Sequence, residues 1–231
     1  MAGHSHWAQI KHKKAIVDAK RGQLISKLVR AISIAAREGS NPELNFKLRS
    51  AIERAKNFQV PIENIERAIN KVSETSKLEE VFYEAYLDEV QLLIKTITDN
   101  KNRTLGEIKH LLNKYGGRLG EVGSVRWNFK EVGVIVVDDK DVDKILTDID
   151  LINDFENKGS EGKTWLIVES KKINDVKNLL DSKKIPIYDI FLDFKPLNTV
   201  NIEDESKKNK INAFIEEALN LDEVDEVFVN I

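Results

Sequence analysis

The 231-residue sequence contains no cysteine. It can therefore form neither a disulfide nor a thiolate metal site, and a reducing compartment fits it best. Nor does any apolar run approach the roughly 18–20 residues that a membrane helix requires. The opening residues, MAGHSHWAQIKHKK, lack the apolar core and the small-residue cleavage site of a secretory signal. These absences favour a cytoplasmic protein that has no contact with a membrane.

The sequence also lacks the short motifs of familiar catalysts. GxSxG, HExxH and GxxxxGK[ST] do not occur. Four glycines follow a predicted helix rather than a strand and lack GxGxxG spacing, so they favour a flexible turn over a phosphate-binding loop; they are Gly116, Gly117, Gly120 and Gly123. We therefore expect no catalytic residues, no cofactor and no bound metal. An enzyme of unrecognised chemistry is the remaining alternative.

What the sequence does contain is an uneven distribution of charge. Residues 1–77 hold 15 Lys and Arg against 7 Asp and Glu, a net charge of +8. The remaining residues hold 21 against 32, a net charge of −11. This division predicts a cationic module that meets a polyanion, attached to an acidic body that offers a surface to a protein partner.

The densest basic cluster lies in an N-terminal arm and the first predicted helix. Lysine and arginine neutralise phosphates and release counterions, while Trp7 and the histidines can stack on unpaired bases. The candidate nucleic-acid-binding residues of this cluster are Lys11, His12, Lys13, Lys14, Lys20, Arg21, Lys27 and Arg30. A second candidate group is Lys101, Arg103 and Arg118, near a polar turn at residues 99–104. The competing interpretation is a solubilising tail and ordinary surface charge.

Apolar residues at helical spacing predict three short helices in residues 1–77. The first starts near Asp18 and ends at Gly39, the second starts at Asn41 as N-cap with Pro42 following, and the third starts at Pro61. Their predicted buried faces are Leu24, Leu28, Ile32 and Ala35, then Leu44, Leu48, Ile52 and Ala55, then Ile62, Ile65 and Ile69. Residues 73–80 are polar and predict a linker.

The pattern then changes to alternating strands and helices. Strands are predicted at 90–98, 124–129, 133–137, 164–169, 185–194 and 224–230, and helices at 105–112, 141–155, 172–182 and 207–220. This order predicts an α+β multidomain protein with two ferredoxin-like domains after the helical one. The predicted division is a basic helical domain at 1–77, a discontinuous domain at 78–130 plus 200–231, and an inserted domain at 131–199.

Several long runs resemble the YebC/PmpR family. They are MAGHSHWAQIKHKKAIVDAKRGQLISKLVRAISIAAREG, LRSAIERAKNF, NIERAINK, ITDNKNRTLGEIKHLLNKYGGRLGEVGSVRWNF and KPLNTV, and the likeness covers nearly the whole chain. The resemblance implies a helical first domain followed by two α+β domains. It also implies a cytoplasmic, DNA-binding transcriptional regulator. The basic residues that it carries over are Lys11, Lys13, Lys14, Lys20 and Arg21 in the opening motif, and Lys101 and Arg103 in TDN-x-NRT.

The resemblance leaves a second function open. Some members are linked instead to translation, including a mitochondrial activator and bacterial proteins that act on ribosomes at proline runs. The polyanion is therefore either DNA or ribosomal RNA. One departure concerns a glycine-rich turn of the form YEGYGPGG, whose counterpart here is YEAYLDEV at residues 83–90. Because its glycines are gone, we expect an altered role for this turn.

Overall fold

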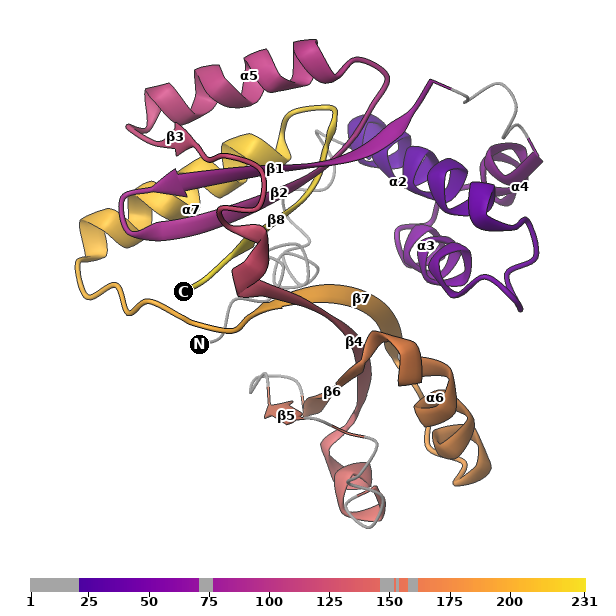
Figure 1. The fold of residues 1–231 in the computed structure, drawn as a ribbon. Helices are drawn as coiled ribbons and strands as arrows, with labels where there is room; N and C mark the ends of the chain where they lie inside the picture. The colour runs from indigo at the N-terminus through magenta and orange to yellow at the C-terminus, as the bar shows by residue number, and fades with distance from the viewer. Residues whose placement is uncertain (1–20, 71–76, 146–151, 153, 158–161) are drawn as a thin grey trace. The chain divides into compact units, whose positions relative to one another are not determined.

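The computed structural model describes residues 21–70, 77–145, 152, 154–157 and 162–231 (Figure 1). The chain separates into two compact units. The first unit runs to Lys130 and resumes with Lys195–Ile231, and the inserted unit is Glu131–Phe194. The three-domain division, with its boundary at residue 199, stays a prediction.

The first unit begins with helices that the apolar spacing anticipated. They are α2 (Arg21–Ala35), which continues as a 3₁₀ turn (Ala36–Glu38), α3 (Phe46–Asn57) and α4 (Ile62–Asn70). Gly39 ends the first of them with φ of 145°, a conformation that L side chains rarely adopt. The shared core is made of Leu28, Ile32, Ala35, Ala36, Leu48, Ile52, Ala55, Val60, Ile65 and Ala68.

Two details of the helical region were predicted wrongly. Helix α3 is capped by Asn45, whose side chain accepts a hydrogen bond from the Leu48 amide, rather than by Asn41. Leu44 consequently lies before the helix and is 87% exposed. Ile62, the first residue of α4, is 64% exposed, because the buried face of this helix begins one turn later at Ile65.

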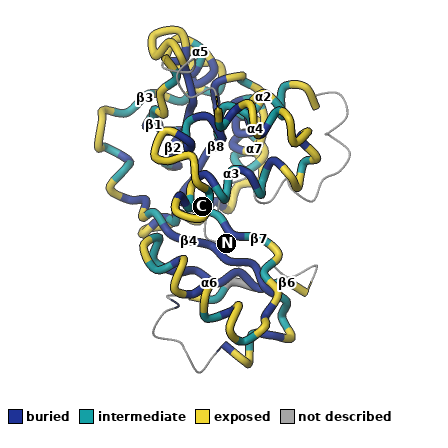
Figure 2. Tube along the Cα trace, turned by 90° about the vertical axis from the view of Figure 1, so that its right-hand side faces the viewer, coloured by how far each residue is buried: buried dark blue, intermediate teal, exposed yellow. Residues whose placement is uncertain are grey.

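The rest of the first unit is a four-stranded sheet covered by two helices. The strands are β1 (Glu79–Leu87), β2 (Val90–Thr98), β3 (Arg118–Leu119) and β8 (Val224–Val229), in the order β3-β1-β2-β8 with antiparallel neighbours. Helices α5 (Lys101–Lys114) and α7 (Glu205–Leu219) pack on one face of the sheet (Figure 1). The outer side of α5 is exposed (Figure 2).

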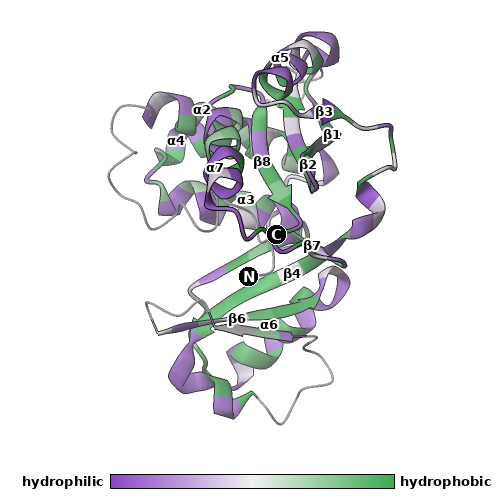
Figure 3. Cartoon of the chain, turned by 90° about the vertical axis from the view of Figure 1, so that its left-hand side faces the viewer, coloured by the Kyte–Doolittle hydropathy of each residue, from purple (hydrophilic) through white to green (hydrophobic). Residues whose placement is uncertain are grey.

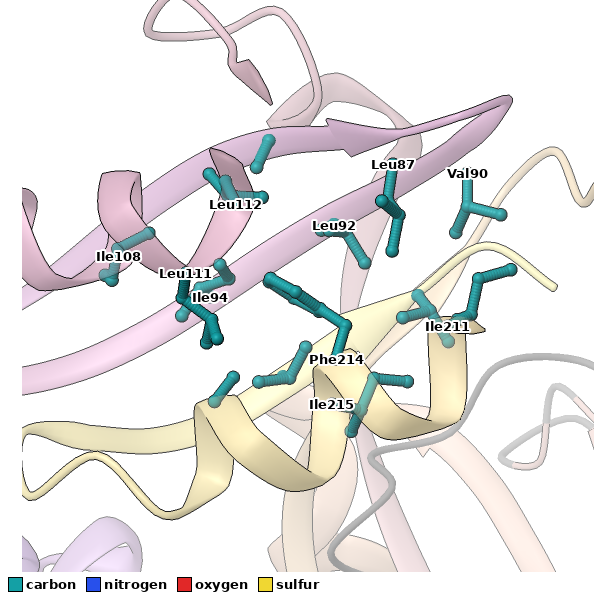
Figure 4. Packing of buried hydrophobic residues seen from close by; sticks show 14 of the residues in the cluster. Leu87, Val90, Leu92, Ile94, Ile108, Leu111, Leu112, Ile211, Phe214 and Ile215 are labelled. Carbon is teal, nitrogen blue, oxygen red and sulfur yellow. The ribbon is translucent and has the colours of Figure 1, made fainter. Parts of the chain in front are cut away.

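The core of this layer explains why both helices share a face. Phe214 of α7 lies between Leu111 of α5 and Leu92 and Ile94 of β2 (Figure 4). Leu92 and Ile94 are two residues apart, so their side chains point to the same face of the strand. Burial of this continuous apolar surface, at about 25 cal/mol per Å², is the main stabilisation of the layer.

Strand β1 was missed by the sequence analysis. Residues 73–80 were predicted to be a linker, but the strand begins at Glu79 and pairs with the whole length of β2. The predicted strand at 124–129 was also wrong, because Arg126–Asn128 forms a 3₁₀ turn. The sheet therefore acquires β1 and β3 from segments that lack a simple apolar alternation.

The inserted unit contains a second four-stranded sheet in the order β5-β6-β4-β7. Its strands are β4 (Phe129–Asp138), β5 (Asp154–Asn157), β6 (Lys163–Glu169) and β7 (Asp189–Pro196), and its helix is α6 (Ile173–Ser182). Strands β4 and β6 are strongly hydrophobic (Figure 3). A Cβ at Gly133 would lie 2.6 Å from Cδ1 of Ile173, so glycine permits the close approach of α6 to β4.

The helix predicted at 141–155 was wrong in its described part. Asp139–Lys144 forms a 3₁₀ helix and Asp154–Asn157 forms β5, while residues 146–151 and 153 lie outside the described residues. The remaining elements confirm the predicted α+β class. Among the described residues, none of the helices combines the length and the apolar character needed to cross a bilayer.

Candidate nucleic-acid interface

The predicted basic arm lies outside the described residues, which begin at its end. Lys11, His12, Lys13, Lys14 and Lys20 are therefore not placed. Arg21, the first residue of α2, is exposed, and its Nη2 lies 3.5 Å from Oε1 of Gln59. This weak contact leaves the guanidinium at the protein surface, next to the point where the arm joins the helix.

Lys27 has an internal role instead of a surface one. The residue is 8% exposed, and its ammonium donates hydrogen bonds to the carbonyl oxygens of Leu219 at 2.6 Å and Val224 at 2.8 Å. Burial lowers the pKa of Lys27 to about 8, against the opposing attraction of Asp225 and Asp222. We therefore leave Lys27 out of the proposed interface.

Two more candidate cations, Arg30 and Arg103, contact the segment around Val224 that binds Lys27. We call residues 222–226 (Asp222, Glu223, Val224, Asp225 and Glu226) the acidic turn. Arg30 donates to the carbonyl oxygen of Asp222 at 3.0 Å. Arg103 lies 2.7 Å from a carboxylate oxygen of both Asp99 and Glu223. The acidic turn thus engages Lys27, Arg30 and Arg103, all of which the sequence analysis assigned to phosphate.

The acidic turn also attracts cations that the sequence analysis did not single out. Arg54 of α3 lies 2.8 Å from Glu226, and Lys95 of β2 lies 3.1 Å from Asp225. Burial alone would raise the pKa of Asp225, but Lys95 and Arg54 hold the pKa below its usual range. The carboxyl group is consequently ionised inside the first unit. The Arg54 pair joins the helical region to β8, the edge strand of the sheet, and the Lys95 pair joins β8 to its neighbour β2.

The second candidate group does not form one site. Lys101 and Arg103 lie in the first turn of α5, whereas Arg118 follows its C-terminal end. Since α5 has 14 residues, its ends are roughly 20 Å apart at 1.5 Å per residue. Lys101 pairs with Glu79 at 2.6 Å. Arg118 is exposed, and its guanidinium carbon lies 4.4 Å from the centre of the Tyr86 ring.

The glycines near Arg118 belong to an ordered loop rather than to the predicted flexible turn. The carboxylate of Glu84, in β1, accepts hydrogen bonds from the amides of Gly123, Val125 and Arg126 at 2.6, 2.5 and 2.7 Å. The Gly120 amide donates to the carbonyl oxygen of Glu84 at 2.7 Å. We call residues 116–128 the tethered loop. Glu84 itself is buried, so one acidic side chain holds three backbone amides of the loop.

Residues 83–90, the counterpart of the family's glycine-rich turn, form the end of β1 and its hairpin. The two-residue connection is Asp88-Glu89, and Asp88 has a φ of 53°. Lys210 lies 2.9 Å from Asp88, and Lys207 lies 2.9 Å from Glu89. Asp88 and Glu89 therefore stand where the family's turn has proline and glycine, and both bind α7, which closes the hairpin onto the body of the first unit.

Two family models match this chain over most of its length. A model described as TACO1/YebC protein N-terminal domain matches residues 5–75, and one described as TACO1/YebC second and third domain matches residues 78–231. The chain belongs to the TACO1/YebC family.

Curated members of the family are similar over their full lengths. A protein of Aquifex aeolicus is 41% identical over 237 residues, covering 100% of this chain and 95% of the relative. A protein of Persephonella marina is 41% identical over 243 residues, with the same two coverages. Both are named "Probable transcriptional regulatory protein". These names describe the relatives as regulatory proteins.

A solved structure supports the fold. The crystal structure of a conserved hypothetical protein from Aquifex aeolicus matches with a TM-score of 0.83 at 41% identity, covering 98% of this chain and 96% of that one. The helical region and the two α+β layers are therefore family features.

Proposed function

We propose that this chain regulates gene expression by binding nucleic acid through its basic N-terminal third, without catalysing a reaction. The observation that carries the proposal is the charge division, +8 over residues 1–77 and −11 over the rest. The names of the relatives agree with it. DNA at a promoter is the first candidate target, and ribosomal RNA is the second.

The internal contacts of Lys27, Arg30 and Arg103 remove these three residues from the set proposed to bind phosphate. Their charges are already paired or bonded at the acidic turn. In the N-terminal third, the candidate cations that remain for a polyanion are those of the arm and the start of α2: Lys11, Lys13, Lys14, Lys20 and Arg21. The acidic remainder as a whole repels phosphate, so the main electrostatic contact lies at one end of the chain and the protein does not coat the nucleic acid indiscriminately.

The test is the salt dependence of binding. The arm variant changes five residues to glutamine: Lys11, Lys13, Lys14, Lys20 and Arg21. The matched control changes five lysines of the inserted unit to glutamine: Lys140, Lys171, Lys172, Lys177 and Lys184. Each phosphate contact contributes a slope of about 0.7–0.9 in log affinity against log salt, so the arm variant should lose about 3–5 units and the control almost none.

Equal slopes in the arm variant and the wild type would overturn the assignment. The identity of the target requires a separate measurement, in which the full chain is crosslinked in cells and the bound nucleic acid is sequenced. Promoter DNA would support transcriptional regulation. Ribosomal RNA without promoter DNA would replace it with the translational function.

A further inference from the structure

The tethered loop holds an exposed tryptophan. Trp127 is 59% exposed, whereas Trp165 of the inserted unit is 7% exposed and packs edge-to-face on Phe191 at 5.5 Å. The indole N–H of Trp127 donates to the carbonyl oxygen of Ser124 at 2.8 Å. Its polar group is satisfied within the loop, so the remaining exposed part of the side chain is an aromatic face.

The orientation of Trp127 is fixed from both sides. The Glu84 carboxylate binds the amides of Val125 and Arg126, which immediately precede it. Asn128, which follows it, is buried and bonds Asn198 through its side chain at 2.8 Å. Ordering an aromatic ring before binding lowers the entropy cost of a stacking contact.

The charge around this ring differs from that of the acidic remainder. Residues 114–130 contain four basic residues, Lys114, Arg118, Arg126 and Lys130, and one acidic residue, Glu121. Arg118 and Lys130 are exposed, and Arg118 is already stacked on Tyr86. The segment that carries the exposed indole therefore has a net charge of +3, inside a portion of the chain with a net charge of −11.

From this combination we propose that Trp127 is a stacking platform for an unpaired nucleobase, with Arg118 and Lys130 facing the adjoining phosphates. This inference rests on the proposed function, since it assigns a second contact to the same nucleic acid. Aromatic side chains beside cations bind single strands with little dependence on sequence, because every base has a π-face. A base inside a blunt duplex is already stacked and cannot reach the indole. The ligand is therefore single-stranded RNA or single-stranded DNA.

The experiment compares the full-length wild type, Trp127→Ala and Trp127→Phe by fluorescence anisotropy. The probes are a mixed-sequence single-stranded RNA, the same sequence as DNA, and the blunt duplex of each. Leu197→Ala is the matched control, because Leu197 is 61% exposed and its amide binds the carbonyl of Asn128. Loss of one stacked base predicts a drop of about 5-fold to 150-fold in single-strand affinity for Trp127→Ala. Trp127→Phe should recover most of it, and duplex affinity should not change.

Two further readouts separate stacking from other roles. Because Trp127 makes no phosphate contact in this proposal, the salt slope of Trp127→Ala should equal that of the wild type, unlike the slope of the arm variant. Quenching of tryptophan emission by a single strand should be smaller in Trp127→Phe than in the wild type. Whether RNA or DNA shows the larger loss identifies the strand that the site prefers.

Four results would overturn the platform. Unchanged single-strand affinity in Trp127→Ala, alongside an arm variant that has lost its slope, rejects the platform and leaves the proposed function intact. Equal losses on single strands and duplexes in both Trp127 variants mean that the residue acts through folding. Loss of ribosome binding with naked RNA unaffected makes the patch a protein-binding surface. A wild type that binds no probe rejects the proposed function and the platform together.

Discussion

Replacing Glu84 by glutamine removes the group that orders the tethered loop while leaving its shape almost unchanged. The carboxylate accepts the amides of Gly123, Val125 and Arg126 at 2.5–2.7 Å. Gly123 binds Oε1 and the other two bind Oε2. Glutamine has one acceptor oxygen and one NH₂ group, so in either orientation its NH₂ group faces at least one backbone N–H of the loop, and two donors meet.

The expected destabilisation follows from these three bonds. A hydrogen bond to a charged group contributes about 1.5–3 kcal/mol and a neutral one about 0.5–1.5 kcal/mol. With its oxygen turned toward Val125 and Arg126, glutamine weakens two bonds and loses the third. We therefore expect Glu84→Gln to lower the free energy of unfolding by about 2–4 kcal/mol. For a chain of this length that corresponds to a Tm lower by roughly 5–15 °C.

Thermal unfolding followed by circular dichroism measures this shift. Glu121→Gln is the matched control, because Glu121 is an exposed carboxylate of the same loop and its change should cost less than about 0.5 kcal/mol. Glu84→Gln should also reproduce the single-strand binding loss of Trp127→Ala. A Glu84→Gln protein that melts with the wild type would refute the reasoning, since the loop would then be ordered by something other than the buried carboxylate.

Four further substitutions test separate parts of the first unit. Gly120→Ala places a Cβ 2.4 Å from Oγ of Ser124 and should destabilise the protein by about 1–3 kcal/mol. A Cβ at Gly106, in α5, has no heavy atom within 4 Å, so Gly106→Ala should stabilise the protein by about 0.5–1 kcal/mol. Equal changes in Tm for the two variants would contradict both predictions. The pKa of Lys27 falls from 10.5 to about 8 on folding, so the unfolded chain binds more protons between these values and stability should rise with pH there. Urea unfolding should show this rise in the wild type and a smaller one in Lys27→Met. Parallel curves of unfolding free energy against pH for the two proteins would refute the contribution of Lys27. Because folding lowers the pKa of Asp225 below 3.8, the ionised carboxylate stabilises the fold above pH 3.8, and this stabilisation is lost as the pH falls further. The difference in unfolding free energy between the wild type and Asp225→Asn should therefore narrow in acid. A gap that is constant with pH in urea titrations would show that the ion pair with Lys95 does not form.

Elements with strong local patterns were predictable from the sequence. The stripe of Leu28 and Ile32 identified α2, and the branched residues of 90–98 identified β2. Strand β1 was not found, because it contains the buried Glu84 and lacks a clean apolar alternation. The acidic side chain is stable there only because amides from a loop about 40 residues later surround it. That loop was in turn predicted as a strand at 124–129, since its tether to β1 is not a local property.

The basic residues illustrate the same limit at the candidate interface. Composition identified an excess of cations in residues 1–77, and Arg21 remains an exposed member. Lys27 and Arg30 were assigned to phosphate because their neighbours in sequence offer few acidic partners. Their actual partners lie in the acidic turn, 192 to 197 positions away along the chain. The run DEVDE at 222–226 was the one available signal, and only the fold brings it beside α2.

The position of β8 after the inserted unit in the sequence has a consequence for biosynthesis. This strand pairs with β2, and its residues complete both the sheet and the acidic turn that binds the helical region. During translation the whole inserted unit leaves the ribosome before β8 is synthesised. The inserted unit can therefore complete its fold before the first unit, although the first unit begins earlier in the chain. A message truncated before the codon for Val224 would yield a nascent chain whose first sheet has an open apolar edge, which chaperones and proteases recognise.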